Sequence, residues 1–523
     1  MNLLLHQLRR CIRSTVSDVL AWAIVVFLLH TLSAPGARAE SEEVILVCPP
    51  AFEKAIQPWV TARSSEGLKV TKIQPRAKAS DLRDAIKQVS TKSTHYILLV
   101  GDTPIIGQPT DPIRQTPTLY MPTTVSAKWG STASLSTDSL YGDFDGDFLP
   151  DAAVGRLPVD EPEQLQKWIA RILARESSTN FGGWRSRLQL IGGIGGFGKV
   201  PDAAIETVTR TIVTTMLPGD TLTHISYASP GHRFCPSNGT FTDAVVNNYR
   251  LGSRFWVYAG HGQVTELDRV APSLGGKAVL DRNSIQRLFT PAETAPIAIL
   301  LACFTGACDA AQDSIAEQMV LRDGGPVAVF AGSRITMPYG NTTAAIGLLQ
   351  GIFRQQAPRL GDAWRFALRD MHQENSGPPK PERLMVDALA TLISPSRGQL
   401  HEERREHMLL YNLLGDPTLR LHHPKPLQIV RKRDTDTSNF LRVEVNAPVS
   451  GTLLVRVDHP VGGVPEGDPN ETLLAKVETT AVTGQPSLLD LPLPLNTKGP
   501  IIIRATVAGH HEWASGHLKT IWP

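Results

Sequence analysis

Apolar residues near the start of the chain form short continuous runs that alternate with segments of helical spacing. The apolar runs lie at 43–48, 68–73 and 96–100, and the helical segments lie at 51–65, 79–89 and 161–176. Strands that are buried on both faces read as continuous apolar runs, and the intervening helices cover those faces. The pattern predicts an α/β unit with a parallel sheet over residues 43–180, interrupted by a long Pro-, Thr- and Ser-rich loop at 105–137.

The same alternation continues over residues 181–422, and then the pattern changes. The expected strands of this second unit lie at 188–191, 254–259, 297–302 and 327–331. From residue 427 to the end, short segments of alternating polarity are separated by Pro, Gly and Asn turns. Alternation with a period of two is typical of half-buried strands. Residues 427–523 are therefore predicted to form a β-sandwich.

The first 39 residues have the order of a secretory signal peptide. Three arginines precede an apolar run at 19–29, and Ala37–Ala39 offers a small-residue cleavage site. The alternative is an uncleaved signal anchor, but the apolar run is about half the length that a spanning helix needs. We therefore expect residues 1–39 to direct export, and we expect no membrane span in the mature chain.

Composition and charge indicate the class of protein and exclude some kinds of binding partner. The chain has 523 residues, of which 41% are hydrophobic and 20% are charged, as in globular proteins of two to four domains. The formal net charge of +2 argues against a nucleic-acid partner. Five cysteines are few for a disulfide scaffold in an exported chain, and their spacing matches no zinc motif. A thiol can therefore be kept for chemistry.

Two reactive side chains follow expected strands of the second unit. His261 stands between two glycines after the strand at 254–259, and Cys303 directly follows the strand at 297–302. Ligands bind beyond the carboxyl ends of strands in open α/β sheets. If the two strands are neighbours, an imidazolium can stabilise the nucleophilic thiolate and later protonate a leaving amine. The backbone amide of Gly262, with that of Cys303, can hold the developing oxyanion.

Each of these residues also has a simpler interpretation. A cysteine after a strand is usually a small buried hydrophobic residue, and Gly-His-Gly is usually a turn. Both occur here in order after matched strands, and this pairing favours the catalytic interpretation.

Several segments, in the same order, resemble the gingipain-like cysteine peptidases. They are Tyr258–Gly262 (YAGHG), Leu301–Cys303 (LAC), Tyr141–Pro158 before the catalytic half, Gly324–Arg334 after the nucleophile, and the closing Asn412–Leu419. The resemblance covers about residues 43–422. It implies a two-part α/β catalytic unit with parallel sheets and a caspase-like second half, followed by an immunoglobulin-like β-sandwich.

By this resemblance, His261 and Cys303 are the catalytic pair of a cysteine endopeptidase that acts on proteins or peptides and requires no cofactor. Family members also use an acidic residue to orient the histidine, and Asp151 is the candidate here because it precedes Val154–Arg156. The better-known secreted members carry a long propeptide. Here the first strand is expected close to the cleavage point, so activation by propeptide removal is not carried over.

Two other functions would use the same features. A transpeptidase would resolve the same acyl-enzyme with an amine instead of water, in protein secretion or surface attachment. A non-catalytic adhesion protein would keep the peptidase fold and bind a partner. The intact pair of His261 and Cys303 favours an enzyme over the adhesion protein.

An acidic loop lies between the long loop and the helix at 161–176. Asp143, Asp145, Asp147 and Asp151 occupy positions 1, 3, 5 and 9 of a calcium-loop pattern. The first three are the expected ligands of a structural calcium ion. The pattern is incomplete, because Phe148 stands where such a loop needs glycine, and an acidic surface turn is the alternative.

Other polar motifs are assigned to structure. The glycine run at 193–198 matches GxGxxG, but a proline follows it and no helix clearly opens there, so a flexible loop is expected in place of a nucleotide site. The Arg- and Glu-rich helix that carries His401 and His407 is interpreted as a solvated face. His422 and His423 are expected at the surface near a domain boundary.

Overall fold

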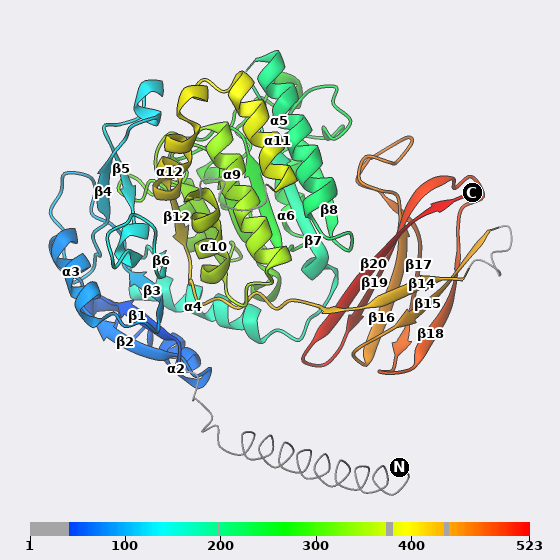
Figure 1. Ribbon diagram of the computed structural model, residues 1–523, viewed down its shortest axis with the longest axis horizontal. Coiled ribbons are helices and arrows are strands. Elements are labelled where there is room, and N and C mark those ends of the chain that lie inside the picture. Colours follow the sequence, from blue (N-terminus) through cyan, green and yellow to red (C-terminus); the bar gives the residue numbers. More distant parts are fainter. Residues whose placement is uncertain (1–40, 197, 373–379, 433–438) are drawn as a thin grey trace, which may run out of the picture. The chain divides into compact units, whose positions relative to one another are not determined.

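The computed structural model describes residues 41–196, 198–372, 380–432 and 439–523 (Figure 1). The predicted signal peptide, residues 1–39, lies outside this part of the chain. Within it, no helix combines the length and the apolar character needed to cross a membrane.

Ten strands form one continuous mixed sheet. Their order is β2 (Lys69–Ile73), β1 (Glu43–Val47), β3 (Thr94–Val100), β6 (Ala153–Leu157), β12 (Tyr411–Leu414), β11 (Ala328–Gly332), β10 (Ile297–Leu301), β9 (Phe255–Ala259), β7 (Arg187–Gly192) and β8 (Leu222–Tyr227). The sequence predicted a two-part unit with parallel sheets, and the structure instead has one sheet, mostly parallel, that runs through both parts. The short strand β12, which was not predicted, lies between β6 and β11, runs antiparallel to β11 and joins the halves.

Helices follow most of these strands. They are α2 (Gln57–Ser65), α3 (Ala79–Val89), α4 (Pro162–Ser177), α5 (Lys199–Thr211), α6 (Phe241–Tyr249), α7 (Arg282–Ile285), α8 (Ile315–Leu321), α9 (Pro338–Leu349), α10 (Leu360–His372), α11 (Pro381–Ile393) and α12 (Leu400–Leu410). Local chemistry sets their starts, as in α4, where Glu161 and Gln164 form a capping box around Pro162. Helices α9, α10 and α12 pack against one another beside the sheet (Figure 1).

Two predicted loops contain regular structure. The segment 105–137 includes a hairpin of β4 (Leu119–Pro122) and β5 (Ser134–Thr137). The glycine run does open a helix, because α5 begins directly after Gly198. Pro201 lies in the first turn of α5, where the backbone N–H has no helical partner and a proline is tolerated.

The residues after 424 form two further sheets. One has the order β13 (Lys425–Pro426), β20 (Trp513–Trp522), β19 (Gly499–Ala508), β16 (Gly451–Asp458) and β17 (Leu473–Ala481), and the other has the order β14 (Gln428–Arg431), β15 (Phe440–Asn446) and β18 (Pro486–Pro492). Alternate residues of β15 are buried, as the period of two predicted. Side chains from both sheets share one hydrophobic core, which includes Val443, Val455 and Ile503.

Candidate active site

The two candidate catalytic residues follow neighbouring strands. β9 and β10 are adjacent and parallel, and Ala259 pairs with Leu301. His261 and Cys303 each lie two residues beyond this pair. Because neighbouring strands are about 4.8 Å apart, the register places the backbones of His261 and Cys303 close together at the same edge of the sheet. Gly262 packs directly on the cysteine, since a Cβ built on it would lie 2.8 Å from the Cys303 carbonyl oxygen.

The thiol of Cys303 is held by the turn after β11. The backbone N–H of Thr336 donates to Sγ at 3.3 Å, and Sγ donates to the Thr336 carbonyl at 3.5 Å. Burial raises the pKa of the Cys303 thiol, and the hydrogen bonds from Thr336 offset part of this effect because they stabilise the thiolate. The next residue, Phe304, has a φ of 57°, a left-handed conformation that is uncommon for a bulky side chain. The candidate nucleophile is therefore followed by a strained turn.

The imidazole of His261 is held by the glycine run. Its Nε2 lies 2.8 Å from the carbonyl oxygen of Gly195. A carbonyl only accepts, so Nε2 carries the proton and donates it in this contact. Gly195 and Gly196 have φ values of 72° and 96°, which favour glycine. The run that was interpreted as a flexible loop therefore contacts the candidate catalytic histidine.

A buried carboxylate organises the backbone around the histidine. One oxygen of Asp268 accepts hydrogen bonds from the backbone N–H groups of Ile194 and His261, both at 3.1 Å, and lies 2.9 Å from the Tyr258 hydroxyl. Burial raises the pKa of Tyr258, and the nearby carboxylate adds to this shift. A Cβ on Gly193 would lie 2.0 Å from the same oxygen. Asp268 therefore joins the glycine run to the histidine loop.

Asp151 is not brought to the histidine. It precedes β6, and three strands, β12, β11 and β10, separate β6 from β9 in the sheet. At about 4.8 Å per strand, this places β6 roughly 19 Å from β9. The carboxylate of Asp151 instead accepts a hydrogen bond from the backbone N–H of Phe144 at 3.0 Å. The structure therefore does not support Asp151 as the residue that orients His261.

Asp151 belongs to the acidic loop. Carboxylate oxygens of Asp143, Asp145 and Asp151 lie within 4.8 Å of one another, so each can offer one oxygen to a common cation. The expected set had Asp147 in the place of Asp151; the Asp147 carboxylate caps the backbone N–H of Leu149 at 2.7 Å. Oxygen donors of this kind fit Ca²⁺.

Helix α12, which carries His401 and His407, was predicted to present a solvated face, and this prediction is wrong. His407 of α12 is fully buried, and its Nε2 accepts a hydrogen bond from the backbone N–H of Met337 at 2.8 Å. Its Nδ1 donates to the Glu403 carbonyl at 2.7 Å. Met337 follows Thr336, which contacts the Cys303 thiol, so the hydrogen bond from Met337 links His407 to the segment beside the candidate nucleophile. His422 was also expected at the surface, but it is only partly exposed, its Nε2 is buried, and burial lowers its pKa to about 4.

Asp268, Thr336 and His407 were missed by sequence reasoning. Asp268 and His407 accept hydrogen bonds from backbone N–H groups of Ile194 and Met337, which lie 74 and 70 positions earlier. Thr336 bonds the Cys303 thiol, 33 positions earlier, through its own backbone. Such pairings have no spacing signature. The strand ends that carry His261 and Cys303 were visible because each follows a continuous apolar run. The four described cysteines, Cys48, Cys235, Cys303 and Cys308, are all free thiols.

Comparison with known proteins identifies the family to which the chain is similar. The sequence model of peptidase family C25 matches residues 37–422. A crystal structure of the Arg-specific cysteine proteinase gingipain R is similar, with 15% identity, a TM-score of 0.54, and coverage of 93% of this chain and 99% of that chain. A complex of the pro- and mature domains of RgpB from Porphyromonas gingivalis gives 14% identity, a TM-score of 0.52, and coverage of 91% and 99%.

At such identities the structural likeness shows the fold alone, and no curated protein sequence matches the chain. The family match is independent of that likeness. It spans both halves of the ten-stranded sheet and the strand ends that carry His261 and Cys303. The chain therefore belongs to peptidase family C25, the gingipain family, and is a cysteine endopeptidase.

Proposed function

We propose that the chain hydrolyses peptide bonds of protein or peptide substrates through a thioester on Cys303, with His261 as the proton carrier. The register of β9 and β10 supports this most directly, because both side chains stand two residues past one paired position. The strained turn at Phe304 and the glycine contacts of His261 add support, since such features cluster at functional sites.

The first step is the transfer of the thiol proton to His261. Burial keeps the Cys303 thiol protonated in the free enzyme, so ionisation depends on the neighbouring base. The N–H of Thr336 stabilises the thiolate that results. The thiolate attacks the carbonyl carbon of the substrate, and the backbone amides of Gly262 and Cys303 receive the negative oxygen.

The second half of the reaction uses the same groups. The protonated His261 gives its proton to the amine nitrogen as the C–N bond breaks, and an acyl-enzyme remains. Water then attacks the thioester while His261 takes a proton from it. The C–S bond breaks, the thiol recovers its proton and the carboxyl product leaves.

Turnover of a mixed peptide library tests this mechanism. Cys303→Ala and His261→Ala are each expected to lower the rate by at least about a thousandfold, because the two groups act as a unit. Cys308→Ala is the matched control and should keep most activity. Products that carry an added amine would favour a transpeptidase. Equal cleavage by wild type and Cys303→Ala would exclude the mechanism.

We propose the same division of the chain as the sequence analysis: a first subdomain at 43–180, a caspase-like catalytic subdomain at 181–422 and an immunoglobulin-like sandwich at 427–523. The two sheets share one core, and their strands are antiparallel except for the short β13, which pairs parallel to β20; this arrangement supports the last of these. Export through residues 1–39 is part of the proposal. Its test is the N-terminal sequence of the secreted protein, which should begin at Glu40.

We also propose a structural calcium ion at Asp143, Asp145 and Asp151. The three carboxylates supply hard oxygen donors at a loop that already turns sharply, with Phe148 at a φ of 69°. Arg83 lies 2.9 Å from one oxygen of Asp143 and neutralises part of the charge, and the other oxygens remain as donors. The site lies away from His261, so the ion would support the fold and take no part in proton transfer.

A further inference from the structure

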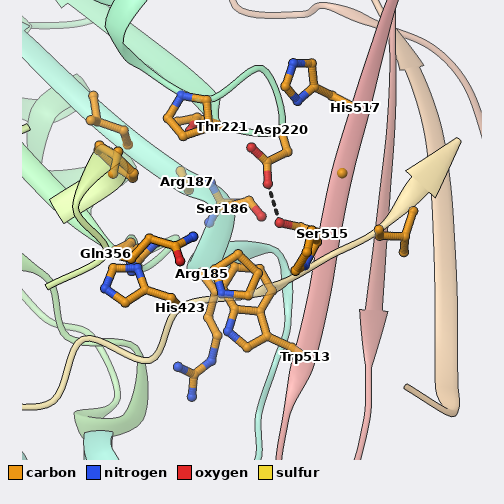
Figure 2. A pocket seen from close by; sticks show the side chains of 18 of the residues that line it. Arg185, Ser186, Arg187, Asp220, Thr221, Gln356, His423, Trp513, Ser515 and His517 are labelled. Carbon is orange, nitrogen blue, oxygen red and sulfur yellow. Dashed lines mark hydrogen bonds between the residues drawn. The ribbon is translucent and has the colours of Figure 1, made fainter. Parts of the chain in front are cut away.

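Two adjoining cavities lie where residues 420–427 lead from the large sheet to the C-terminal sheets. The larger has a volume of about 370 Å³, and Arg185, His423 and Trp513 are among the side chains that line it (Figure 2). The smaller has a volume of about 10 Å³, enough for about one water-sized sphere. Arg185, Arg254 and Trp513 line both.

The smaller cavity is lined by cations. Arg175, Arg185, Arg254 and Arg420 surround it together with His422, and no carboxylate is among its lining residues. The first three arginines are only 8%, 5% and 8% exposed. In the part of the chain that the structure describes, none of these three forms an ion pair.

Among these three arginines, Arg175 has the fewest hydrogen-bond partners for its guanidinium group. Its guanidinium stacks on Trp184, with the carbon 4.9 Å from the ring centre, and its buried Nη1 has no hydrogen-bond partner among the described residues. The buried Nε2 of His422 lacks a partner in the same sense. By contrast, Arg254 donates to the Leu421 carbonyl at 2.8 Å, and Arg185 donates to the Ser178 carbonyl at 3.0 Å.

The nearest acidic side chains are engaged elsewhere. Glu176 accepts hydrogen bonds from Arg63 at 2.8 Å and from the backbone N–H of Arg420 at 2.7 Å. Asp220 accepts one from the Ser515 hydroxyl (Figure 2). Burial lowers the pKa of Arg175 to about 9, and the neighbouring guanidiniums add to this shift. At neutral pH the arginines still carry their charges, and a buried charge without a counterion is strongly unfavourable.

We propose that the smaller cavity binds one small monovalent anion of about the size of chloride. The cavity volume selects a single atom over a phosphate or a sulfate. The unpartnered Nη1 of Arg175 supplies a donor, and the surrounding guanidiniums supply the charge. The anion would tie α4 to β20, since Arg175 and Trp513 line the cavity from these two elements. His422 has a φ of 34°, a conformation that needs support from its surroundings.

Thermal unfolding of the whole secreted protein in different sodium salts, at matched ionic strength, tests this site. In wild type, chloride and bromide should raise the melting temperature by about 1–2 °C per tenfold concentration above the dissociation constant, relative to gluconate. In Arg175→Met this difference should vanish. Arg171→Met is the matched control, because Arg171 is also buried in α4 but donates to the Arg322 and Val320 carbonyls, and it should keep the halide effect.

A second measurement does not depend on a variant that folds. Crystals of wild type grown in sodium bromide should show an anomalous bromine peak between Arg175, Arg254 and His422. An empty cavity at saturating bromide, or an equal halide effect in wild type and Arg175→Met, would overturn the proposal. A larger stabilisation by phosphate or acetate than by chloride would also overturn it, because it would assign the ligand to the 370 Å³ cavity.

Discussion

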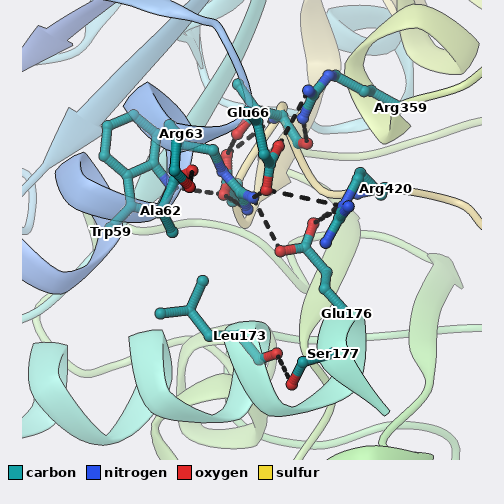
Figure 3. Close-up of polar contacts among 12 residues, drawn as sticks. Trp59, Ala62, Arg63, Glu66, Leu173, Glu176, Ser177, Arg359 and Arg420 are labelled. Atoms are coloured by element: carbon teal, nitrogen blue, oxygen red, sulfur yellow. Dashed lines mark hydrogen bonds and ion pairs between the residues drawn. The ribbon is translucent and has the colours of Figure 1, made fainter. Parts of the chain in front are cut away.

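The guanidinium of Arg63 lies 2.7 Å from the carboxylate of Asp416, a residue 353 positions later in the chain. Neither side chain is exposed to solvent. The same carboxylate accepts a hydrogen bond from the Trp59 indole at 2.6 Å, and Glu176 completes the pairing of Arg63 at 2.8 Å. Figure 3 shows Arg63 beside two further carboxylates, those of Glu66 and Glu176. Burial alone would raise the pKa of Asp416, but the charge of Arg63 and the hydrogen bonds from Thr418, Arg63 and Trp59 together hold the pKa below its usual value. The closing motif therefore fastens the end of the catalytic half to α2.

Breaking this pair should destabilise the protein strongly. Arg63→Met leaves the buried charge of Asp416 uncompensated, and we expect the free energy of unfolding to fall by about 3–5 kcal/mol. The measurement is unfolding in urea followed by circular dichroism. Arg442→Met is the control, since the Arg442–Asp490 pair is partly exposed and should contribute little. A similar midpoint for both variants would contradict a structural role for the Arg63–Asp416 pair.

The sequence was sufficient to predict the strands that lead to the candidate site, but it was not sufficient to predict β12. Continuous apolar runs at 254–259 and 297–302 located the two strands, and the position of His261 and Cys303 at their ends followed from the general behaviour of α/β sheets. The short β12 carries Asn412 between apolar residues, so it offered no run to detect.

The sequence-based predictions that proved wrong concern polar side chains that are buried. Glu403, Arg404, Glu406 and His407 give α12 the sequence of a solvated helix, yet all four are buried. Glu406, for example, accepts hydrogen bonds from the backbone N–H groups of three consecutive residues, Thr124–Ser126, about 280 positions earlier. Polarity predicts exposure only when no such partner exists, and the partner comes from tertiary structure.

A buried carboxyl pair should make stability fall as pH rises. Asp102 and Glu317 interact directly, and burial raises the pKa of Glu317 to about 7. Between about pH 4.5 and pH 7 the unfolded chain loses this proton while the folded chain keeps it. The free energy of unfolding should therefore fall over this window by up to a few kcal/mol, at about 1.4 kcal/mol per pKa unit.

Urea midpoints of wild type and Glu317→Gln at pH 5 and pH 7.5 check this sign. Glutamine keeps an oxygen that can accept the Ser314 backbone N–H, so the cap of α8 should survive. The variant should lose less stability than wild type between the two pH values. Glu163→Gln, at an exposed position, should behave as wild type. An equal pH dependence in all three proteins would exclude a raised pKa at Glu317.

We expect His407 to affect the catalytic rate only by positioning the segment that contacts the Cys303 thiol. His407→Phe removes the acceptor of the Met337 N–H, and the adjoining Thr336 should then hold the Cys303 thiol less well. Small displacements of a nucleophile cost about 10–100-fold in rate. We therefore expect kcat to fall by this factor with little change in KM, as measured with a peptide identified from the library.

The conservative variant separates position from stability. His407→Gln offers a side-chain oxygen to the same N–H and should recover much of the lost kcat. His401→Gln, earlier on the same helix, should leave kcat unchanged. If His407→Phe and His407→Gln lost activity equally while both remained folded, the hydrogen bond to Met337 would not be what positions the nucleophile.

Removal of calcium should loosen the acidic loop and leave the catalytic groups in place. The carboxylates of Asp143, Asp145 and Asp151 lie close together and repel one another unless a cation or Arg83 compensates. A chelator should therefore lower the melting temperature of wild type by several degrees, and added calcium should restore it. Asp145→Asn should reduce this difference, whereas Asp147→Asn should keep it, because Asp147 lies outside the cluster. A chelator effect that survived in Asp145→Asn would place the ion elsewhere in the chain.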